Sequence, residues 1–220
     1  MKILINISKI VSICLLMLFA SCKKDRVVAE VDLMQHYIAG KFTFQQGPEL
    51  PFALIPTSAN KAWFVWVSEK REVDYTFENN KFTTSINGGE FSCDIQNGNL
   101  TNIVVKSASL GIPIAALNKK QDADLSLTGK RYEAPILLLN TGAVLFDNYY
   151  FKFDNDAAKS YYTSNPTSGN YIITTKAYEK LADGCFYNEQ AKAFGVILNN
   201  KLEVETKIGN DYVLFSGTRK

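Results

Sequence analysis

Apolar and polar side chains alternate in several stretches of this sequence, and this alternation constrains the fold more than any other feature. In residues 71–78, Val73, Tyr75 and Phe77 fall on one side, with charged or hydroxyl-bearing residues between them. Because successive side chains of a β-strand point to opposite faces of a sheet, the pattern predicts a strand with one buried and one exposed face. Such one-sided strands are typical of antiparallel sheets.

Turn-forming residues separate these stretches. Asparagine and glycine tolerate the positive φ angles of tight hairpin turns, so they mark strand reversals. The first series comprises the turns Asn79-Asn80, Asn87-Gly88-Gly89 and Asn97-Gly98 and the strands expected at 71–78, 82–86, 91–95 and 100–105. Further strands are expected at 149–153, 171–175, 194–198, 202–206 and 212–215. The sequence therefore predicts an all-β fold built as an antiparallel meander.

Short motifs recur in the same order along the chain, although their spacings differ. Residues 38–42, 75–79, 89–91 and 97–100 are similar to residues 127–131, 151–155, 169–171 and 199–202, respectively. An internal duplication with about ninety residues per half would produce this pattern. Any antiparallel β protein also tends to repeat an aromatic pair before a turn. Two repeated halves and one large barrel or sandwich are therefore both compatible with the sequence.

A change in composition divides the two strand-rich parts. Residues 107–126 contain an apolar stretch interrupted by Gly111 and Pro113, followed by a polar stretch. Glycine and proline break regular structure, so this segment is expected to be a connector. It would separate a first β half at residues 38–106 from a second β half at residues 127–220.

Two short helical segments are also expected. Val27, Val31, Met34 and Ile38 have the spacing of one helix face, which places His36 on the surface of that helix. Residues 178–184 end at a glycine, as short helices often do, and are expected to form one or two helical turns.

The first residues have the pattern of a secretory signal. Lys2 and Lys9 precede a short apolar run, which ends in Phe19-Ala20-Ser21-Cys22. A basic start, an apolar core and small residues before a cleavage point are typical of such signals. The last four residues resemble the lipobox of bacterial envelope lipoproteins. That resemblance implies a signal peptide at 1–21, a lipid on the thiol of Cys22, and a tether with a short helix at 22–37.

The resemblance to lipoproteins also implies a location. The protein is expected in the cell envelope, held to a membrane by its N-terminal lipid. Lys23 follows the cysteine, whereas an aspartate there favours inner-membrane retention in some bacteria, so the outer membrane is the expected site. An unlipidated, secreted protein is the alternative.

The charge of the mature chain bears on its partners. Lys2 and Lys9 leave with the signal, which has no acidic residue, so 22 of the 24 basic side chains remain against 22 acidic ones. Binding to nucleic acid requires a concentrated basic surface, which this balance does not favour. Nucleic acid is therefore not an expected partner.

Two cysteines remain after Cys14 and Cys22 are accounted for. Cys93 and Cys185 would lie in a compartment that permits disulfides, so a bond between them is possible. Cys93 also alternates with Phe91 and Ile95, which is the pattern of a buried free thiol. The sequence does not decide between these alternatives.

No catalytic or metal-binding motif is present. The chain has one histidine, His36, and no metal-ligand spacing around it. It also lacks nucleophile-elbow, phosphate-loop and dinucleotide-binding patterns. No catalytic residue, metal or cofactor is therefore expected, and the protein is not expected to be an enzyme.

Aromatic residues are the best remaining candidates for a binding site. In residues 62–67, Phe64 and Trp66 share one face of the expected strand, and Trp63 and Val65 share the other. A strand with two apolar faces is either buried on both sides or lines a cavity. Phe64 and Trp66 are the candidate ligand-binding residues. Tyr149-Tyr150 likewise places rings on opposite faces.

Gly40-Lys41-Phe42 and Gly129-Lys130-Arg131-Tyr132, which open the two halves, resemble the start of lipocalin-like barrels. That resemblance implies β-barrels with a ligand-holding interior. The expected function is a non-enzymatic binding or accessory module for a hydrophobic ligand or an envelope partner protein. The alternatives are a glycan-binding surface lipoprotein and an envelope hydrolase with dispersed carboxylates.

Overall fold

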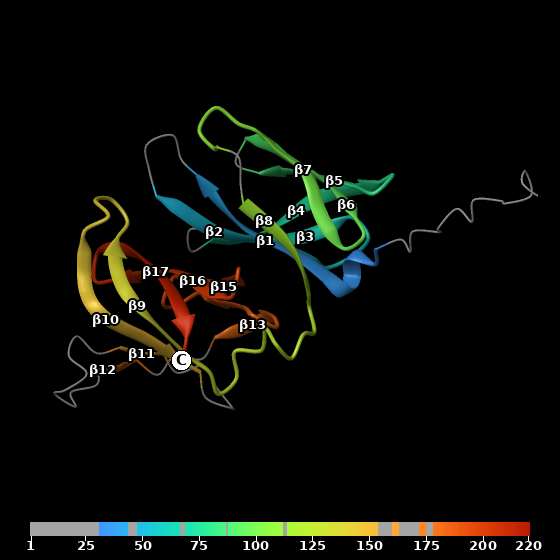
Figure 1. Cartoon of the computed structure of the whole chain (residues 1–220). Helices are drawn as coiled ribbons and strands as arrows, with labels where there is room; N and C mark the ends of the chain where they lie inside the picture. Colours follow the sequence, from blue (N-terminus) through green and yellow to red (C-terminus); the bar gives the residue numbers. More distant parts are fainter. Residues whose placement is uncertain are drawn as a thin grey trace, which may run out of the picture. The chain divides into compact units, whose positions relative to one another are not determined.

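The computed structural model confirms the all-β, antiparallel fold (Figure 1). It describes residues 31–43, 48–66, 69–86, 88–111, 114–153, 160–162, 172–174 and 178–220. Within these ranges, the only helical element is a three-residue 3-10 helix, η1 (Leu33–Gln35), and all strand pairs are antiparallel.

The first sheet is a nearly closed barrel of eight strands. They are β1 (His36–Thr43), β2 (Glu49–Pro56), β3 (Lys61–Trp66), β4 (Glu69–Glu78), β5 (Lys81–Ile86), β6 (Gly89–Gln96), β7 (Asn99–Lys106) and β8 (Ile114–Lys119). Consecutive strands pair from β1 to β7, and β8 returns to pair with β1. The edge strands β7 and β8 approach each other, which brings the barrel close to closure.

The second sheet follows the same plan with its own strands. It contains β9 (Arg131–Leu138), β10 (Val144–Lys152), β13 (Glu179–Ala182), β14 (Cys185–Asn188), β15 (Ala193–Leu198), β16 (Lys201–Ile208) and β17 (Asp211–Arg219). The last strand, β17, pairs with the first, β9. The hairpin of β11 (Ser160–Tyr162) and β12 (Ile172–Thr174) follows β10 in the chain, and β11 lies next to β10.

Asparagines occupy the tight turns, as the sequence predicts. Asn79, Asn80 and Asn97 have φ values of 52°, 61° and 52°, and Asn199 and Asn200 have values of 51° and 62°. These left-handed conformations fit the right-handed twist of the flanking strands. Local turn chemistry therefore explains why these neighbouring strands reverse where they do.

Each sheet encloses its own apolar core. The first core is rich in fully buried phenylalanines, among them Phe42, Phe52 and Phe64. Phe42 and Phe52 stack with their ring centroids 4.0 Å apart. Gly40 makes room for this packing, since a Cβ there would lie 2.7 Å from the Phe52 ring. The second core contains Tyr132, Ile136, Phe151, Phe153, Phe186 and Phe215, among others.

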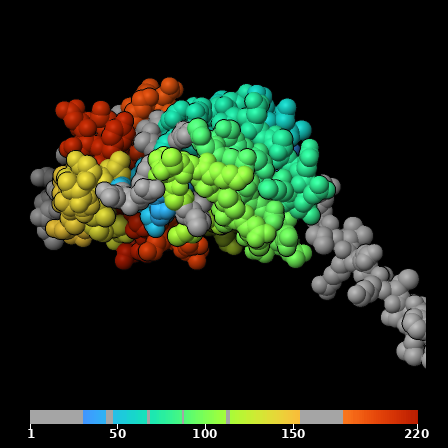
Figure 2. All heavy atoms as spheres, turned by 90° about the horizontal axis from the view of Figure 1, so that it is seen from above, coloured from blue at the N-terminus to red at the C-terminus, as the bar shows by residue number. Residues whose placement is uncertain are grey.

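A third apolar cluster joins the outer faces of the two sheets. Tyr37, Ala39, Ala53, Ile55 and Val65 come from the first sheet, and Ala182, Cys185, Tyr187, Phe194 and Val196 come from the second. The teal and green atoms of the first sheet adjoin the orange and red atoms of the second in the space-filling view (Figure 2). Strands β1, β2 and β3 are therefore buried on both faces.

Of the two expected helical segments, the one at 178–184 is wrong, whereas residues 27–30 of the first lie outside the described residues. The segment expected to be helical up to Ile38 contains η1, and His36 and Ile38 lie in β1. Because β1 is covered on both faces, Tyr37, Ile38 and Ala39 are all buried, and the alternation of a strand disappears. Residues 179–182 form β13, and Gly184, at φ 73°, serves the following turn rather than a helix end.

The segment expected to be a connector contains a strand. Residues 114–119 form β8, whose Ala115 and Leu117 pack toward the first core. The first sheet consequently ends at Lys119, and the second begins at Arg131. Glycine and proline precede β8, and its sequence, an apolar run followed by Asn118 and Lys119, does not alternate, so the sequence did not indicate a strand here.

Candidate functional site

The proposed lipid anchor, Cys22, lies outside the described residues, and so does the preceding signal. Among the residues that the structure describes, no helix is long and apolar enough to span a membrane. The lipoprotein prediction therefore continues to depend on the sequence.

The aromatic candidates of β3 lie in the first core. Phe64 is completely buried, and its ring centroid lies 6.3 Å from that of Phe42 and 6.5 Å from that of Phe52. Trp66 is partly buried and meets Phe42 edge-on at 6.0 Å. Neither residue lines either of the two surface cavities described below. Their ligand-binding role remains a prediction, while their observed contacts are those of core residues.

The possible disulfide between Cys93 and Cys185 is absent. Both are buried free thiols, and they belong to different apolar clusters. Cys93 faces the interior of the first barrel, whereas Cys185 lies between the sheets. Burial raises the pKa of Cys93 to about 12 and also raises that of Cys185. Both side chains therefore remain protonated and act as packing residues.

His36 opens β1 rather than occupying a helix surface, and its Nδ1 lies 2.8 Å from the carbonyl oxygen of Asp32. No group of three or more histidine, cysteine, aspartate or glutamate side chains in the described ranges is arranged to hold a metal ion.

The larger of the two cavities is a groove of about 250 Å³ on the second sheet. It lies over β9 and β10 and is lined by Arg131, Glu133, Ala134, Pro135, Asp147, Asn148, Tyr149, Tyr150 and Lys220. The pairing of these strands shifts twice, between Val144 and Phe146 and again between Phe146 and Tyr149. Such bulges redirect side chains, and here they present Asp147 and Asn148 to solvent.

Charged contacts organise the groove. The guanidinium carbon of Arg131 lies 4.2 Å from the centroid of the Tyr150 ring, and the guanidinium also pairs with Glu133. Lys220 Nζ lies 4.0 Å from the same carboxylate. Stacking against the ring restricts the motion of the guanidinium, so its donor groups are held in place. Asp147 adds a second carboxylate, and the two acidic side chains balance the two basic ones.

A second, smaller cavity of about 170 Å³ lies between the two sheets. Its floor is an ion pair between Lys41 of β1 and Glu203 of β16, with 2.9 Å between Nζ and Oε1. Ser216 donates a hydrogen bond to the same oxygen, also at 2.9 Å. The two charged side chains are only 17% and 8% exposed. Because the ion pair joins a residue of each sheet, its role is to stabilise the contact between the sheets.

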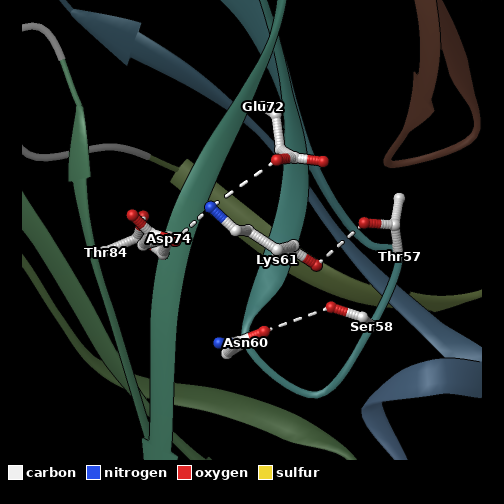
Figure 3. Close-up of polar contacts among 7 residues, drawn as sticks. All are labelled: Thr57, Ser58, Asn60, Lys61, Glu72, Asp74 and Thr84. Carbon is white, nitrogen blue, oxygen red and sulfur yellow. Dashed lines mark hydrogen bonds and ion pairs between the residues drawn. The ribbon is translucent and has the colours of Figure 1, made fainter.

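A third polar cluster surrounds the turn between β2 and β3 (Figure 3). Lys61 Nζ lies 2.6 Å from Asp74 and 3.6 Å from Glu72. The hydrogen bond and charge of Asp74 raise the pKa of Lys61. These side chains are 40% exposed or more, so the ion pairs lie at the surface and contribute little to stability. Substitutions here can serve as controls for substitutions in the groove.

Comparison with known proteins found no family model that matches the chain and neither a curated protein nor a solved structure that is similar to it. The site must therefore be judged by its own chemistry.

The sequence reveals only part of the groove. It places Tyr149 and Tyr150 on opposite faces of a strand. In the structure both border the groove, but Tyr149 also packs in the second core, whereas Tyr150 lies against Arg131. Arg131 and Glu133 alternate with Tyr132 on β9, which indicates that they share a face. The strand bulge that adds Asp147 leaves no recognisable signal in the sequence.

Proposed function

We propose that this chain is a non-enzymatic, lipid-anchored binding module of the cell envelope. It binds polar ligands of the glycan class on its surface rather than inside a barrel. The lipobox-like residues 19–22 support the anchor and the envelope location, with the outer membrane as the expected site. The groove over β9 and β10 supports the binding role.

The observation that carries the proposal is the contrast between the filled cores of the two sheets and the open groove. Fully buried aromatic and aliphatic side chains occupy both cores, among them Phe52, Phe91, Phe153 and Val204. This packing favours surface recognition over a hydrophobic ligand held inside a barrel. The groove, by contrast, offers polar groups to solvent.

The balance of charges in the groove indicates the ligand class. Arg131, Asn148 and Lys220 supply hydrogen-bond donors, and Glu133, Asp147 and Asn148 supply acceptors. With two positive and two negative side chains, the groove suits a neutral ligand that makes many hydrogen bonds. A saccharide has these properties. Because ligand pockets for drug-sized molecules span about 300–1,000 Å³, this smaller groove suits one sugar unit of a longer chain.

Glycan arrays followed by calorimetric titration test this proposal. The mature chain, in a detergent without sugar groups, is expected to bind neutral oligosaccharides. Asp147→Asn and Glu133→Gln remove acceptor charge at the groove, and each is expected to weaken binding at least about tenfold, as loss of a charged hydrogen bond predicts. Asp74→Asn makes the same chemical change at the exposed β2–β3 turn and should leave the affinity unchanged.

Three results would contradict the proposal. Equal binding by all three variants would exclude the groove, and saturable binding of an apolar probe without glycan binding would favour a hydrophobic ligand. If the protein releases reducing ends from a glycan, and Asp147→Asn or Glu133→Gln abolishes that release, the chain is a hydrolase.

The lipid anchor is tested separately. Cys22→Ser is expected to yield an unprocessed or soluble protein, and a processed mutant that still partitions into the detergent phase would contradict lipidation.

A further inference from the structure

The side chain of Lys70 is held in an aromatic and acidic environment remote from the groove. Its Nζ lies 4.8 Å from the centroid of the Trp63 ring and 5.7 Å from that of Tyr187. The same nitrogen donates a hydrogen bond to Glu179 Oε2 at 2.5 Å. Two rings and one carboxylate therefore surround a single ammonium group.

Four strands from both sheets build this site, called here the Lys70 site. Trp63 and Lys70 belong to β3 and β4 of the first sheet, whereas Glu179 and Tyr187 belong to β13 and β14 of the second. Tyr187 is only 6% exposed, so its ring is fixed by packing in the cluster between the sheets. The Glu179 side chain is 52% exposed, which places the open side of the site at the carboxylate.

Further carboxylates make the surroundings of the rings negative. Burial raises the pKa of Tyr187, and the charges of Glu189, Glu179 and Glu69 raise it further. These three carboxylates approach the phenol from β4, from β13 and from the turn after β14. A cation is stabilised by negative charge and by the electron-rich faces of aromatic rings. The rings and the three carboxylates therefore stabilise a positively charged group in this site, in addition to the hydrogen bond that Glu179 accepts.

We propose that the Lys70 site binds a quaternary ammonium group, such as that of choline, and that Lys70 occupies it as an internal competitor in the unliganded protein. Aromatic rings with a nearby carboxylate are the groups that proteins use to recognise such cations. Lys70 is the second residue of β4, and its side chain is 19% exposed, so its ammonium has a route to solvent. When it leaves, a ligand ammonium takes the same position between the rings.

The lysine ammonium and the ligand group can be compared in volume and in hydration. The end of a lysine side chain, from Cγ to Nζ, and a trimethylammonium group each contain four non-hydrogen atoms and so have similar volumes, although the ligand group is broader. A methylated ammonium is less strongly hydrated than a lysine ammonium, so its transfer into an aromatic site costs less free energy. Exchange of Lys70 for such a ligand therefore returns the more strongly hydrated ammonium to water and places the less hydrated one between the rings.

Ligand-observed NMR with choline chloride tests this inference on the mature chain, in a detergent that lacks a choline headgroup. Saturable broadening of the choline methyl signal is expected for the wild type. Lys70→Ala removes the competitor and is expected to tighten binding at least tenfold. Lys61→Ala removes a lysine that pairs with two carboxylates at the exposed β2–β3 turn, so it should leave the affinity at the wild-type value.

A second set of variants identifies the site. In the Lys70→Ala background, Trp63→Leu is expected to abolish choline binding. Glu179→Gln is expected to weaken it at least fivefold, and because the Glu179 side chain is 52% exposed, this variant should still fold. Equal titrations with sodium chloride control for ionic strength. Equal affinities of the wild type and Lys70→Ala, the absence of saturable binding to the wild type, or an unchanged affinity after Glu179→Gln would each overturn the proposal.

Discussion

At the scale of single residues, the aromatic side chains of β3 divide between two environments. Phe64 and Trp66 point into the first core, and Trp63 and Val65 point toward the second sheet. The two apolar faces that the sequence shows are thus explained by burial on both sides. A strand between two apolar layers needs no ligand to cover it.

Replacing Phe64 tests its core role. Phe64→Ala is expected to lower the free energy of unfolding by about 3–5 kcal/mol, because the lost ring leaves a cavity among Phe42, Phe52 and Trp66. Urea denaturation measures this change. Tyr212→Ala removes an aromatic ring that is 38% exposed and should cost less than about 1 kcal/mol. A folded Phe64→Ala protein of wild-type stability would instead indicate a ligand cavity.

Buried acidic groups make the fold sensitive to alkali. Burial raises the pKa of Cys93 from 9.0 to about 12 and also raises the pKa of Cys185, Tyr37 and Tyr132. The unfolded thiols lose their protons near pH 9, while the folded ones keep theirs. Unfolding therefore releases protons above that pH, and stability falls as the pH rises.

Urea denaturation between pH 7 and pH 10.5 checks this linkage. The free energy of unfolding is expected to be constant up to about pH 8 and then to decline, with a limiting slope of roughly 1.4 kcal/mol per pH unit for each group that ionises only on unfolding. Cys93→Ala should reduce the slope between pH 9 and pH 10.5, after allowance for any change in stability at pH 7. A flat profile to pH 10.5 would contradict the burial of these groups.

At the scale of elements, β8 shows most clearly what tertiary structure adds. It pairs with β1 through six residue pairs, from Lys41↔Ile114 to His36↔Lys119. The pairing joins segments more than seventy residues apart, so neither partner identifies the other locally. Without β8, the outer edge of β1 would have no strand beside it in this sheet.

A proline in β8 tests its role as a strand. Ala116 lies opposite Ala39 in the register, and Ala116→Pro is expected to lower the free energy of unfolding by more than about 1 kcal/mol, since proline restricts the backbone and removes an amide donor. Ala123→Pro makes the same change at the second position of the Asp122–Leu125 turn, where proline is favoured, and should have little effect. Equal stability of both variants would show that β8 contributes no strand pairing.

Particular elements show which parts of the structure the sequence can predict. Turns such as Asn79-Asn80 and one-sided strands such as β5 follow from local chemistry, so the sequence predicts them. The first residues of β1, up to Ile38, were predicted as the end of a helix because burial on both faces removes the alternation. The groove depends on shifted pairing between β9 and β10, and the Lys70 site joins residues separated by more than a hundred positions. Neither arrangement can be obtained from local patterns.

At the scale of the whole molecule, apolar and polar contacts together fix the two sheets to each other. Tyr37 is completely buried in the cluster between the sheets, and its hydroxyl donates a hydrogen bond to the carbonyl oxygen of Asp183 at 2.9 Å. On another part of the interface, Lys41 pairs with Glu203. Removing one member of such a buried pair leaves the other charge without its partner, which is more costly than removing both. The two sheets are therefore expected to unfold together.

Two optical probes can test this cooperativity. Both tryptophans lie in β3, where Trp66 packs in the first core and Trp63 faces the second sheet. Fluorescence therefore reports on the first sheet and its contact with the second, whereas far-ultraviolet circular dichroism reports on the strands of both. The wild type is expected to give coincident urea transitions, as two-state unfolding requires. Glu203→Gln leaves Lys41 with only Glu49, a more exposed carboxylate 3.6 Å from its Nζ, and is expected to lower the transition midpoint. Lys41→Met combined with Glu203→Gln should recover part of the loss. Separate transitions in the wild type would show that the contacts between Tyr37, Lys41 and the second sheet are too weak to couple the two sheets.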